Sequence, residues 1–264
     1  MSDGAGAPRI DLRVEERGAA GRIARLTIDR QAKLNVLNRA LIAELGDKLA
    51  GLAGDDGLRA VVLTGAGSRA FIGGADIGDM AALDHEGARA FITLLHRACA
   101  AVRDLPVPVI ARIRGYALGA GLEVAAACDL RIAEEESRFG MPEVKVGIPS
   151  VIEAALLPSL IGWGRTRRLL FTGETIGAAE AERWGLIEWR VPAAALDGVV
   201  EQVLSAILAC GPEAIRLQKA LIREWEDLPL SQAIARGITR FAEAYGTDEP
   251  KRMMQAFLAK KKKR

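Results

Sequence analysis

GYALGAGLEVAAACD, residues 115–129, joins a glycine-rich turn to a run of apolar residues, with a single carboxylate between the two. Gly119, Ala120 and Gly121 leave backbone N–H groups uncovered by bulky side chains. A buried helix is expected to begin here, and the first N–H groups of a helix have no intrahelical acceptor. Glu123 falls in the first turn, where the helix dipole alone favours a negative charge. The pattern therefore fits a helix-stabilising carboxylate and a functional one equally well.

Strand and helix patterns alternate on both sides of this stretch. Residues 10–15 and 24–29 alternate apolar and polar side chains, as strands with one buried face do. Residues 60–65 form a continuous apolar run typical of a strand buried on both faces. Further strands are expected at 107–113 and 129–133, and helices from Asn38 onward and over about 86–103. This alternation predicts an α/β fold.

From about residue 178 the periodicity is almost entirely helical. We therefore expect a flexible N-terminal tail at 1–9, a core at 10–195 and a helical C-terminal region at 196–264. The late helices carry apolar faces that a thin terminal layer cannot bury alone, which predicts self-association.

The composition excludes several classes of protein. The chain has 264 residues, a net charge of +2, three scattered cysteines and two histidines. No metal-ligand spacing is present, so neither a metal site nor a disulfide scaffold is expected. No apolar run is long enough to cross a membrane, and no secretion signal precedes the core. A cytoplasmic protein without nucleic acid as its general partner is the expectation.

Two glycine-rich turns lie before residue 81. Gly65, Gly67 and Ala70 match the G-x-G-x-x-[GA] dinucleotide fingerprint, but that motif has to open a helix, and FIGG follows here instead. A glycine turn after a strand is the stronger interpretation. In FIGGADIGDM, residues 71–80, Ala75 has no side chain large enough to block its own N–H, and Asp76 is placed to cap the turn after it.

A second carboxylate lies in FGMPEVKVGIPS, residues 139–150, where Glu143 stands between a proline and another Gly/Pro-rich turn. Two amides aimed at one point form an oxyanion hole, and two nearby carboxylates can move protons on atoms next to a carbonyl. Paired carboxylates also suit a glycosidase. A sugar site, however, does not need two open amide turns and would want more aromatic residues than the 5% present.

Taken in order, FIGGADI, GYALGAGLEVAAACD and FGMPEVKVGIP resemble the signature segments of the enoyl-CoA hydratase/isomerase, or crotonase, superfamily. RQAKLNVLN, LTGETIGAAEAERWGLIEWRV and MMQAFLAKK fit other segments of that family, so the resemblance covers about residues 10–260. It implies a crotonase-like spiral of ββα units followed by a helical trimerisation region. It also implies a homotrimer or a hexamer built as a dimer of trimers.

The resemblance further implies an activity and its residues. It implies an enoyl-CoA hydratase of fatty acid β-oxidation, with Glu123 and Glu143 as catalytic residues and the amides of Ala75 and Ala120 as the oxyanion hole. Many members have glycine where Ala120 stands. Coenzyme A is part of the acyl-CoA substrate, so no separate cofactor is implied. By the same resemblance, the residues that bind the substrate or coenzyme A are Lys33, Leu34, Gly74, Asp76, Ile77, Gly119, Ser150, Phe257 and Lys260.

One segment departs from the family pattern. Hydratases usually continue from the second glutamate into LGIIPGAGGTQRL, whereas VGIPSVIEAALL is one residue shorter before the proline. Ser150 replaces a glycine whose amide helps to hold the water, and Glu153 adds a third carboxylate. We expect Glu153 to face solvent in a drifted subfamily. The alternative is an altered acyl pocket or reaction.

Other functions on the same fold stay open at the level of sequence. A double-bond isomerase, a dehydratase or a lyase is the nearest alternative, because one fold hosts many chemistries. Isomerases typically keep only one of the two glutamates, which favours hydration. An RNA-binding or scaffold protein is a further alternative, based on the basic runs at 165–168 and 260–264.

Overall fold

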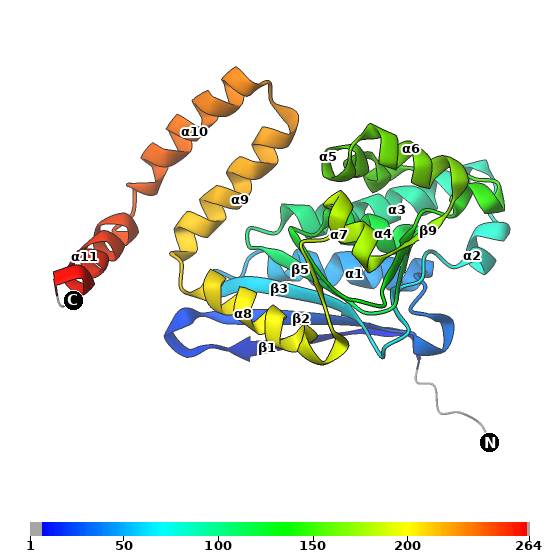
Figure 1. Ribbon diagram of the computed structural model, residues 1–264, viewed down its shortest axis with the longest axis horizontal. Coiled ribbons are helices and arrows are strands. Elements are labelled where there is room, and N and C mark those ends of the chain that lie inside the picture. The colour runs from blue at the N-terminus through cyan, green and yellow to red at the C-terminus, as the bar shows by residue number, and fades with distance from the viewer. Residues whose placement is uncertain (1–6, 263–264) are drawn as a thin grey trace.

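The computed structural model describes residues 7–262 and contains two β-sheets surrounded by helices (Figure 1). The large sheet begins with an antiparallel hairpin and continues in parallel. Its order is β1 (Arg9–Glu16), β2 (Arg22–Asp29), β3 (Leu58–Gly65), β5 (Val109–Ile113), β7 (Leu130–Glu134) and β10 (Trp189–Val191). The small sheet has the order β4 (Ala70–Ile72), β6 (Tyr116–Leu118), β8 (Arg138–Gly140) and β9 (Thr175–Gly177).

From β3 to β8, consecutive strands enter the two sheets alternately. β3, β5 and β7 lie side by side in the large sheet, while β4, β6 and β8, which follow them in the chain, lie side by side in the small one. Helices α2 (Ile77–Ala81) and α3 (His85–Asp104) follow the first pair of strands, and α4 (Ala120–Ala127) follows the second. The third pair leads through the short helices η3 (Glu143–Val146) and η4 (Ile152–Leu156) into α5 (Leu157–Ile161). The expected spiral of ββα units is confirmed.

Both faces of the large sheet are covered. On one face, α1 (Arg39–Leu52), α3 and α4 form the main core with side chains such as Val61 and Leu63. On the other face, α8 (Leu196–Leu208) packs Val200 and Leu204 against Val62 and its neighbours. This explains the continuous apolar run of β3, since a strand covered on both faces has no polar side. The cap of α1 is also confirmed, because the N–H of Leu41 donates to the Asn38 side chain at 2.9 Å.

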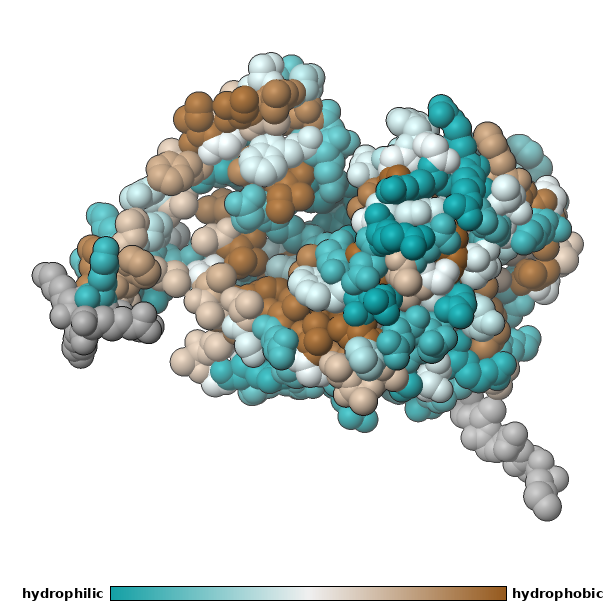
Figure 2. All heavy atoms as spheres, in the orientation of Figure 1, coloured by the Kyte–Doolittle hydropathy of each residue, from teal (hydrophilic) through white to brown (hydrophobic). Residues whose placement is uncertain are grey.

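The remaining C-terminal helices differ in how they pack. α6 (Trp163–Thr172) and α7 (Ala178–Trp184) lie over the small-sheet side, whereas α9 (Pro212–Asp227), α10 (Leu230–Ala244) and α11 (Glu249–Lys262) extend away from the sheets (Figure 1). Figure 2 shows a brown apolar strip along the arm where α10 lies. The exposed apolar side chains of this strip are Leu230, Ile234, Ile238, Phe241 and Tyr245. An apolar face of this kind is normally buried against a partner.

The turn that resembled a dinucleotide fingerprint is a strand connection. Residues 65–70 join β3 to β4, and no helix begins there. A Cβ on Gly65 would lie 2.1 Å from the carbonyl oxygen of Phe71, so the glycine is required by a close backbone approach. The fingerprint interpretation is therefore excluded.

Several expectations concern the ends of the chain and membranes. Residues 1–6 of the expected tail lie outside the described residues, and β1 already begins at Arg9. Within residues 7–262, no single helix is long and apolar enough to cross a bilayer. Residues 193–208 and 212–227 reach that length only together, across a 105° bend, and the first of these segments packs on the large sheet.

Candidate active site

A pocket of about 270 Å³ opens where the short strands end. β4, β6 and β8 are parallel neighbours, so their carboxyl ends lie at the same edge of the small sheet. The turns that follow them contribute Ala75, Ala120 and Glu143 to the pocket lining. Residues distant in the sequence thus meet because of strand order, as ligand sites in parallel sheets commonly do.

Two backbone amides face this pocket without a protein acceptor. Next to the first, the N–H of Leu37 donates to the carbonyl of Gly74 at 2.8 Å, and the N–H of Asp76 donates to the carbonyl of Leu37 at 2.9 Å. This bridge leaves the intervening N–H of Ala75 unused. Ala120 is the first residue of α4, so its N–H has no intrahelical partner. Among residues 7–262, neither N–H has an acceptor, and both residues line the pocket.

The segment RQAKLNVLN holds the first of these turns. The buried Asn35 accepts from the backbone N–H of Arg30 at 2.9 Å and donates to the carbonyl of Ala70 at 2.8 Å. The N–H of Gly73 donates to the carbonyl of Leu34 at 2.9 Å. Lys33 and Leu34 therefore lie beside the turn, but they do not line the pocket. The amide groups of this segment position the backbone around Ala75.

Asp76 also supports the turn rather than lining the pocket. Its carboxylate accepts from the N–H of Gly78 at 2.9 Å, which caps α2, and pairs with Arg30 at 2.7 Å. Burial alone would raise the pKa of Asp76, but the hydrogen bonds from Arg30 and Gly78 outweigh it and hold the pKa below its ordinary value. The predicted cap by Asp76 is confirmed. The Asp76 carboxylate also points to Arg30. Its neighbour Ile77 does line the pocket.

Glu123 is a buried carboxyl group in the first turns of α4, with 4% of its surface exposed. Burial, followed by the negative charges of Glu143 and Glu153, raises its pKa from the ordinary range to about 8, while a hydrogen bond from Ala154 acts in the opposite direction. That bond joins the backbone N–H of Ala154 to Glu123 Oε1 at 3.3 Å. Glu123 is therefore protonated at neutral pH in the substrate-free protein.

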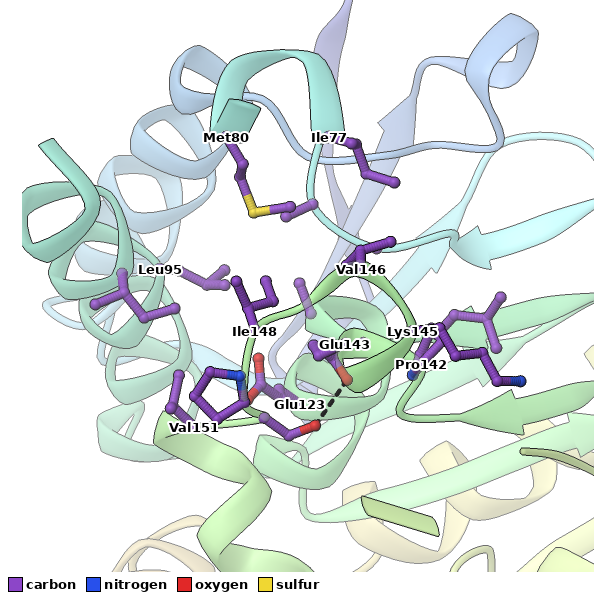
Figure 3. A pocket seen from close by; sticks show the side chains of 18 of the residues that line it. Ile77, Met80, Leu95, Glu123, Pro142, Glu143, Lys145, Val146, Ile148 and Val151 are labelled. Carbon is purple, nitrogen blue, oxygen red and sulfur yellow. Dashed lines mark hydrogen bonds between the residues drawn. The ribbon is translucent and has the colours of Figure 1, made fainter. Parts of the chain in front are cut away.

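Glu143 faces Glu123 across the pocket but is only half-buried (Figure 3). The hydroxyl of Ser150 donates to Glu143 Oε2 at 2.7 Å, the bond dashed in Figure 3. Gly119 makes room for this carboxylate, because a Cβ there would lie 2.3 Å from Glu143 Oε1. Gly119 also has a φ of +52°, a conformation that favours glycine. The turn at Gly119 thus leaves the space that the Glu143 carboxylate occupies.

Apart from Ser150 and Lys145, the rest of the pocket is lined by apolar residues and glycines. Figure 3 shows the side chains of α2, α3 and the 146–151 turn around the space next to the two glutamates. The labelled apolar side chains are Ile77, Met80, Leu95, Val146, Ile148 and Val151. Two proton-carrying groups and two free amides therefore stand at the end of an apolar cavity, an arrangement that suits a carbonyl compound with an apolar chain.

The expectation that Glu153 faces solvent is wrong. Glu153 is 3% exposed because η4 packs between α3 and α4. Its Oε1 lies 2.9 Å from Nδ1 of His96, and its Oε2 has no hydrogen-bond partner among the described residues. The sequence analysis missed His96, although it is one of only two histidines in the chain. Its position on α3, far from the signature segments, gave no reason to connect it with Glu153.

Phe257 and Lys260 are not brought to the pocket of their own chain. α11 lies at the opposite end of the molecule from α2 (Figure 1), and Phe257 is 69% exposed. The side chain of Lys260 lies outside the described part of the structure. Within one chain Phe257 therefore lies away from the pocket, and the role of these two residues in binding coenzyme A stays a prediction.

Comparison with known proteins gives consistent results along nearly the whole chain. A family model described as "Enoyl-CoA hydratase/isomerase" matches residues 18–264. The "Short-chain-enoyl-CoA hydratase" of Clostridium acetobutylicum is 35% identical over 92% of this chain and 93% of its own. The "Crotonyl-CoA hydratase" of Syntrophomonas wolfei is 35% identical over 91% of this chain and 93% of its own. The crystal structure of an enoyl-CoA hydratase from Bacillus anthracis superimposes with a TM-score of 0.88 at 33% identity, covering 94% of this chain and 96% of that one.

Proposed function

Because this chain belongs to the enoyl-CoA hydratase/isomerase family, we propose that its pocket adds water across the 2,3 double bond of a trans-2-enoyl-CoA thioester. The observation that carries this proposal is the pair of glutamates, Glu123 and Glu143, facing each other beside two unused amides. Hydration needs a site that polarises the thioester carbonyl and moves protons on both sides of the neighbouring double bond. The pocket holds groups for both tasks, the polarisation of the carbonyl and the transfer of protons.

The amides of Ala75 and Ala120 form the oxyanion hole of the proposed reaction. As water adds at C3, charge moves through C2 onto the thioester oxygen, which becomes enolate-like. Two N–H groups without other acceptors stabilise that charge more than they stabilise the neutral carbonyl. Loss of one such donor typically costs about 3 kcal/mol of transition-state stabilisation.

The two glutamates supply the proton transfers. One carboxylate takes a proton from water as its oxygen bonds to C3, and the other carboxyl group delivers a proton to C2. This requires one ionised and one protonated group, and the raised pKa of Glu123, about 8, keeps one proton in the pair at neutral pH.

The apolar cavity receives the acyl chain. Its volume of about 270 Å³ suits a short chain, in agreement with the names of the two hydratase relatives. We place the pantetheine arm along Gly74 and Ile77, with the exposed Lys33 toward the phosphates of coenzyme A. Coenzyme A belongs to the substrate, and the proposed chemistry needs no further cofactor.

We also propose that the protein is a homotrimer or a hexamer. The exposed apolar strip of α10 supports this, because a single chain leaves it uncovered. Phe257 and Lys260 would then reach coenzyme A only in the pocket of a neighbouring copy. The protein is proposed to act in the cytoplasm, in fatty acid β-oxidation.

The alternatives are less well supported. Double-bond isomerases typically keep only one of the two glutamates, and here both line the pocket. Of the two basic runs behind an RNA-binding role, the end of the run at 260–264 lies outside the described residues. In the run at 165–168, Arg165 and Arg168 lie over the ring of Trp184, and Arg168 also pairs with Glu180 at 3.1 Å. These arginines therefore stabilise the packing of α6 on α7.

A panel of enoyl-CoA thioesters tests the proposal directly. Purified protein should hydrate crotonyl-CoA, with activity falling as the acyl chain outgrows the cavity. Salt-dependent retention on RNA is measured in parallel. Absence of hydration on every thioester, with the fold intact by circular dichroism, would contradict the proposed function.

A further inference from the structure

The turn behind the two glutamates is strained. Ile152 has a φ of +41°, in the left-handed region that β-branched residues very rarely occupy. Such a conformation costs roughly 1–3 kcal/mol and persists only where the surroundings enforce it. The neighbouring Ser150 and Val151 line the pocket, so the strain lies at its wall. Something must hold this turn in place.

The His96–Glu153 pair is the contact that can do so. Glu153 follows Ile152 directly, and its buried carboxyl is joined to α3 through Nδ1 of His96 at 2.9 Å. Burying a carboxylate without a partner is costly, so the imidazole compensates much of that cost. His96 is 54% exposed, which leaves its other side in water. The pair therefore fastens η4 to a long, well-packed helix.

The same turn also holds Glu123. Ala154 follows Glu153, and its N–H donates to Glu123 Oε1 at 3.3 Å. Within residues 7–262, this is the one hydrogen bond that the Glu123 carboxyl makes. A shift of η4 would therefore break the hydrogen bond between Ala154 and Glu123. Position matters here, because a displacement of about 1 Å in a reacting group can cost on the order of 100-fold in rate.

We propose that His96 and Glu153 are positioning residues, which lock the strained turn at Ile152 and thereby orient Glu123 through the N–H of Ala154. The inference rests on the proposed hydratase function. Glu153 is not itself assigned to the chemistry, because it does not line the pocket and its Oε2 is buried. The pair instead accounts for the departure of VGIPSVIEAALL from the family pattern.

The charged and titratable groups around the turn are few. α3 presents His96 and Cys99 to Glu153, α4 presents Glu123, and η3 presents Glu143 to Glu123. Burial, followed by the charges of Glu153 and Glu123, raises the pKa of the Cys99 thiol well above its ordinary value. This thiol therefore stays neutral, and among these groups His96 is the one that lies within hydrogen-bond distance of Glu153 Oε1, at 2.9 Å.

Four variants of the full-length protein test the proposal with crotonyl-CoA as the probe. Glu153→Ala and His96→Ala remove the contact and should lower kcat about 10- to 100-fold, with KM nearly unchanged. Glu153→Gln and His96→Asn keep a hydrogen-bonding group near the same place and should retain most of the activity. The exposed pair of His85 and Glu86, joined at 3.0 Å, is the matched control, and His85→Ala should be neutral.

A second measurement separates positioning from general destabilisation. In a Glu123→Gln background, Glu153→Ala should cause no further loss of kcat, because its effect passes through Glu123. Loss that persists undiminished in that background, or kcat within about twofold of the wild type in folded Glu153→Ala, would overturn the proposal. If Glu153→Ala does not fold, His96→Ala decides by the same criteria. An inactive wild type would instead defeat the hydratase function, and the positioning role with it.

Discussion

Glu123 and Glu143 are alike in chemistry and unlike in surroundings, and the difference comes from where each lies in the fold. Glu123 sits in a helix whose residues are all buried, while Glu143 sits in a short helix at the pocket mouth. Two identical groups in unequal environments can hold different protonation states at one pH, which acid–base catalysis requires.

Replacing either glutamate by glutamine should lower turnover sharply. Glutamine keeps the size and the hydrogen bonds but cannot exchange the proton, and general acid–base steps contribute about 100- to 10,000-fold. Binding of acetoacetyl-CoA, measured by calorimetry, should persist in Glu123→Gln and Glu143→Gln. The double variant should lose much less than the product of the single losses, because the residues act as a unit. Near-normal turnover in either single variant would contradict the role assigned to that residue.

The buried carboxyl of Glu123 should also make the stability of the fold depend on pH. The folded-state pKa of Glu123, about 8, lies above its ordinary value. Its contribution to stability is therefore fully present below pH 4 to 5 and is lost as the pH rises through about 8. Glu123→Gln stays neutral, so its melting temperature should match the wild type at pH 4 and exceed it at pH 9. The difference amounts to a few kcal/mol, at about 1.4 kcal/mol per pKa unit. Parallel melting curves from pH 4 to pH 9 would contradict the raised pKa.

At the scale of single residues, the sequence predicted which residues line the pocket better than it predicted what their side chains contact. Ala75, Ala120, Glu123 and Glu143 all line the pocket, as the resemblance implied. The hydrogen bond from Ser150 to Glu143 and the burial of Glu153 were not predicted. Both depend on how the shortened turn packs on other elements, which a local pattern does not contain.

Among the elements, the turn before α4 is the most constrained. Gly119 combines a φ of +52° with a site where a Cβ would meet Glu143. Gly119→Ala should therefore displace Glu143 and strain the amide of Ala120, lowering kcat by at least about 100-fold.

A glycine on another helix provides the control for this variant. Gly198 in α8 has open space around its Cβ position, and Gly198→Ala should leave kcat unchanged while stabilising the fold by about 0.5–1 kcal/mol. Kinetics and thermal melting of the two variants together make the test. Equal kcat in both would show that the turn tolerates a side chain.

The long elements were predicted and the short ones were not. α1, α3, β3 and β5 follow clear periodic patterns and were expected close to their observed bounds. The strands of the small sheet have three residues each, which is too short for alternation to show. They are strands because their neighbours pair with them. The small sheet, which brings the turns of the site together, could therefore not be predicted from the sequence pattern.

On the scale of the whole molecule, the resemblance predicted the spiral, whereas local patterns predicted only α/β alternation. The sequence also did not indicate that α8 would close the second face of the large sheet while α9 to α11 leave it. The four helices look alike in period. They differ in what they can pack against. Once α8 has packed on the second face of the large sheet, that face has no apolar surface left for the later helices.

The uncovered strip on α10 should hold copies of the chain together. Ile238 is 71% exposed at its centre, and Ile238→Glu should place an unpaired charge in the interface and produce monomers. Light scattering at micromolar concentration measures the mass. Thr239→Glu, a charge on the next exposed residue of the helix, is the control. A wild-type monomer at that concentration would contradict the proposed trimer or hexamer.

The pairing of the short strands also fixes a length inside the pocket. β4 and β6 are adjacent, and neighbouring strands lie about 4.8 Å apart. Ala75 and Ala120 follow these two strands closely, so we expect their N–H groups to be roughly one strand spacing apart. An N–H···O bond spans about 2.9 Å, so a single oxygen equally far from both nitrogens, and to one side of the line between them, can accept from both. The distance between the two amides is thus set by the spacing of paired strands, and the side chains that line the acyl cavity do not determine it.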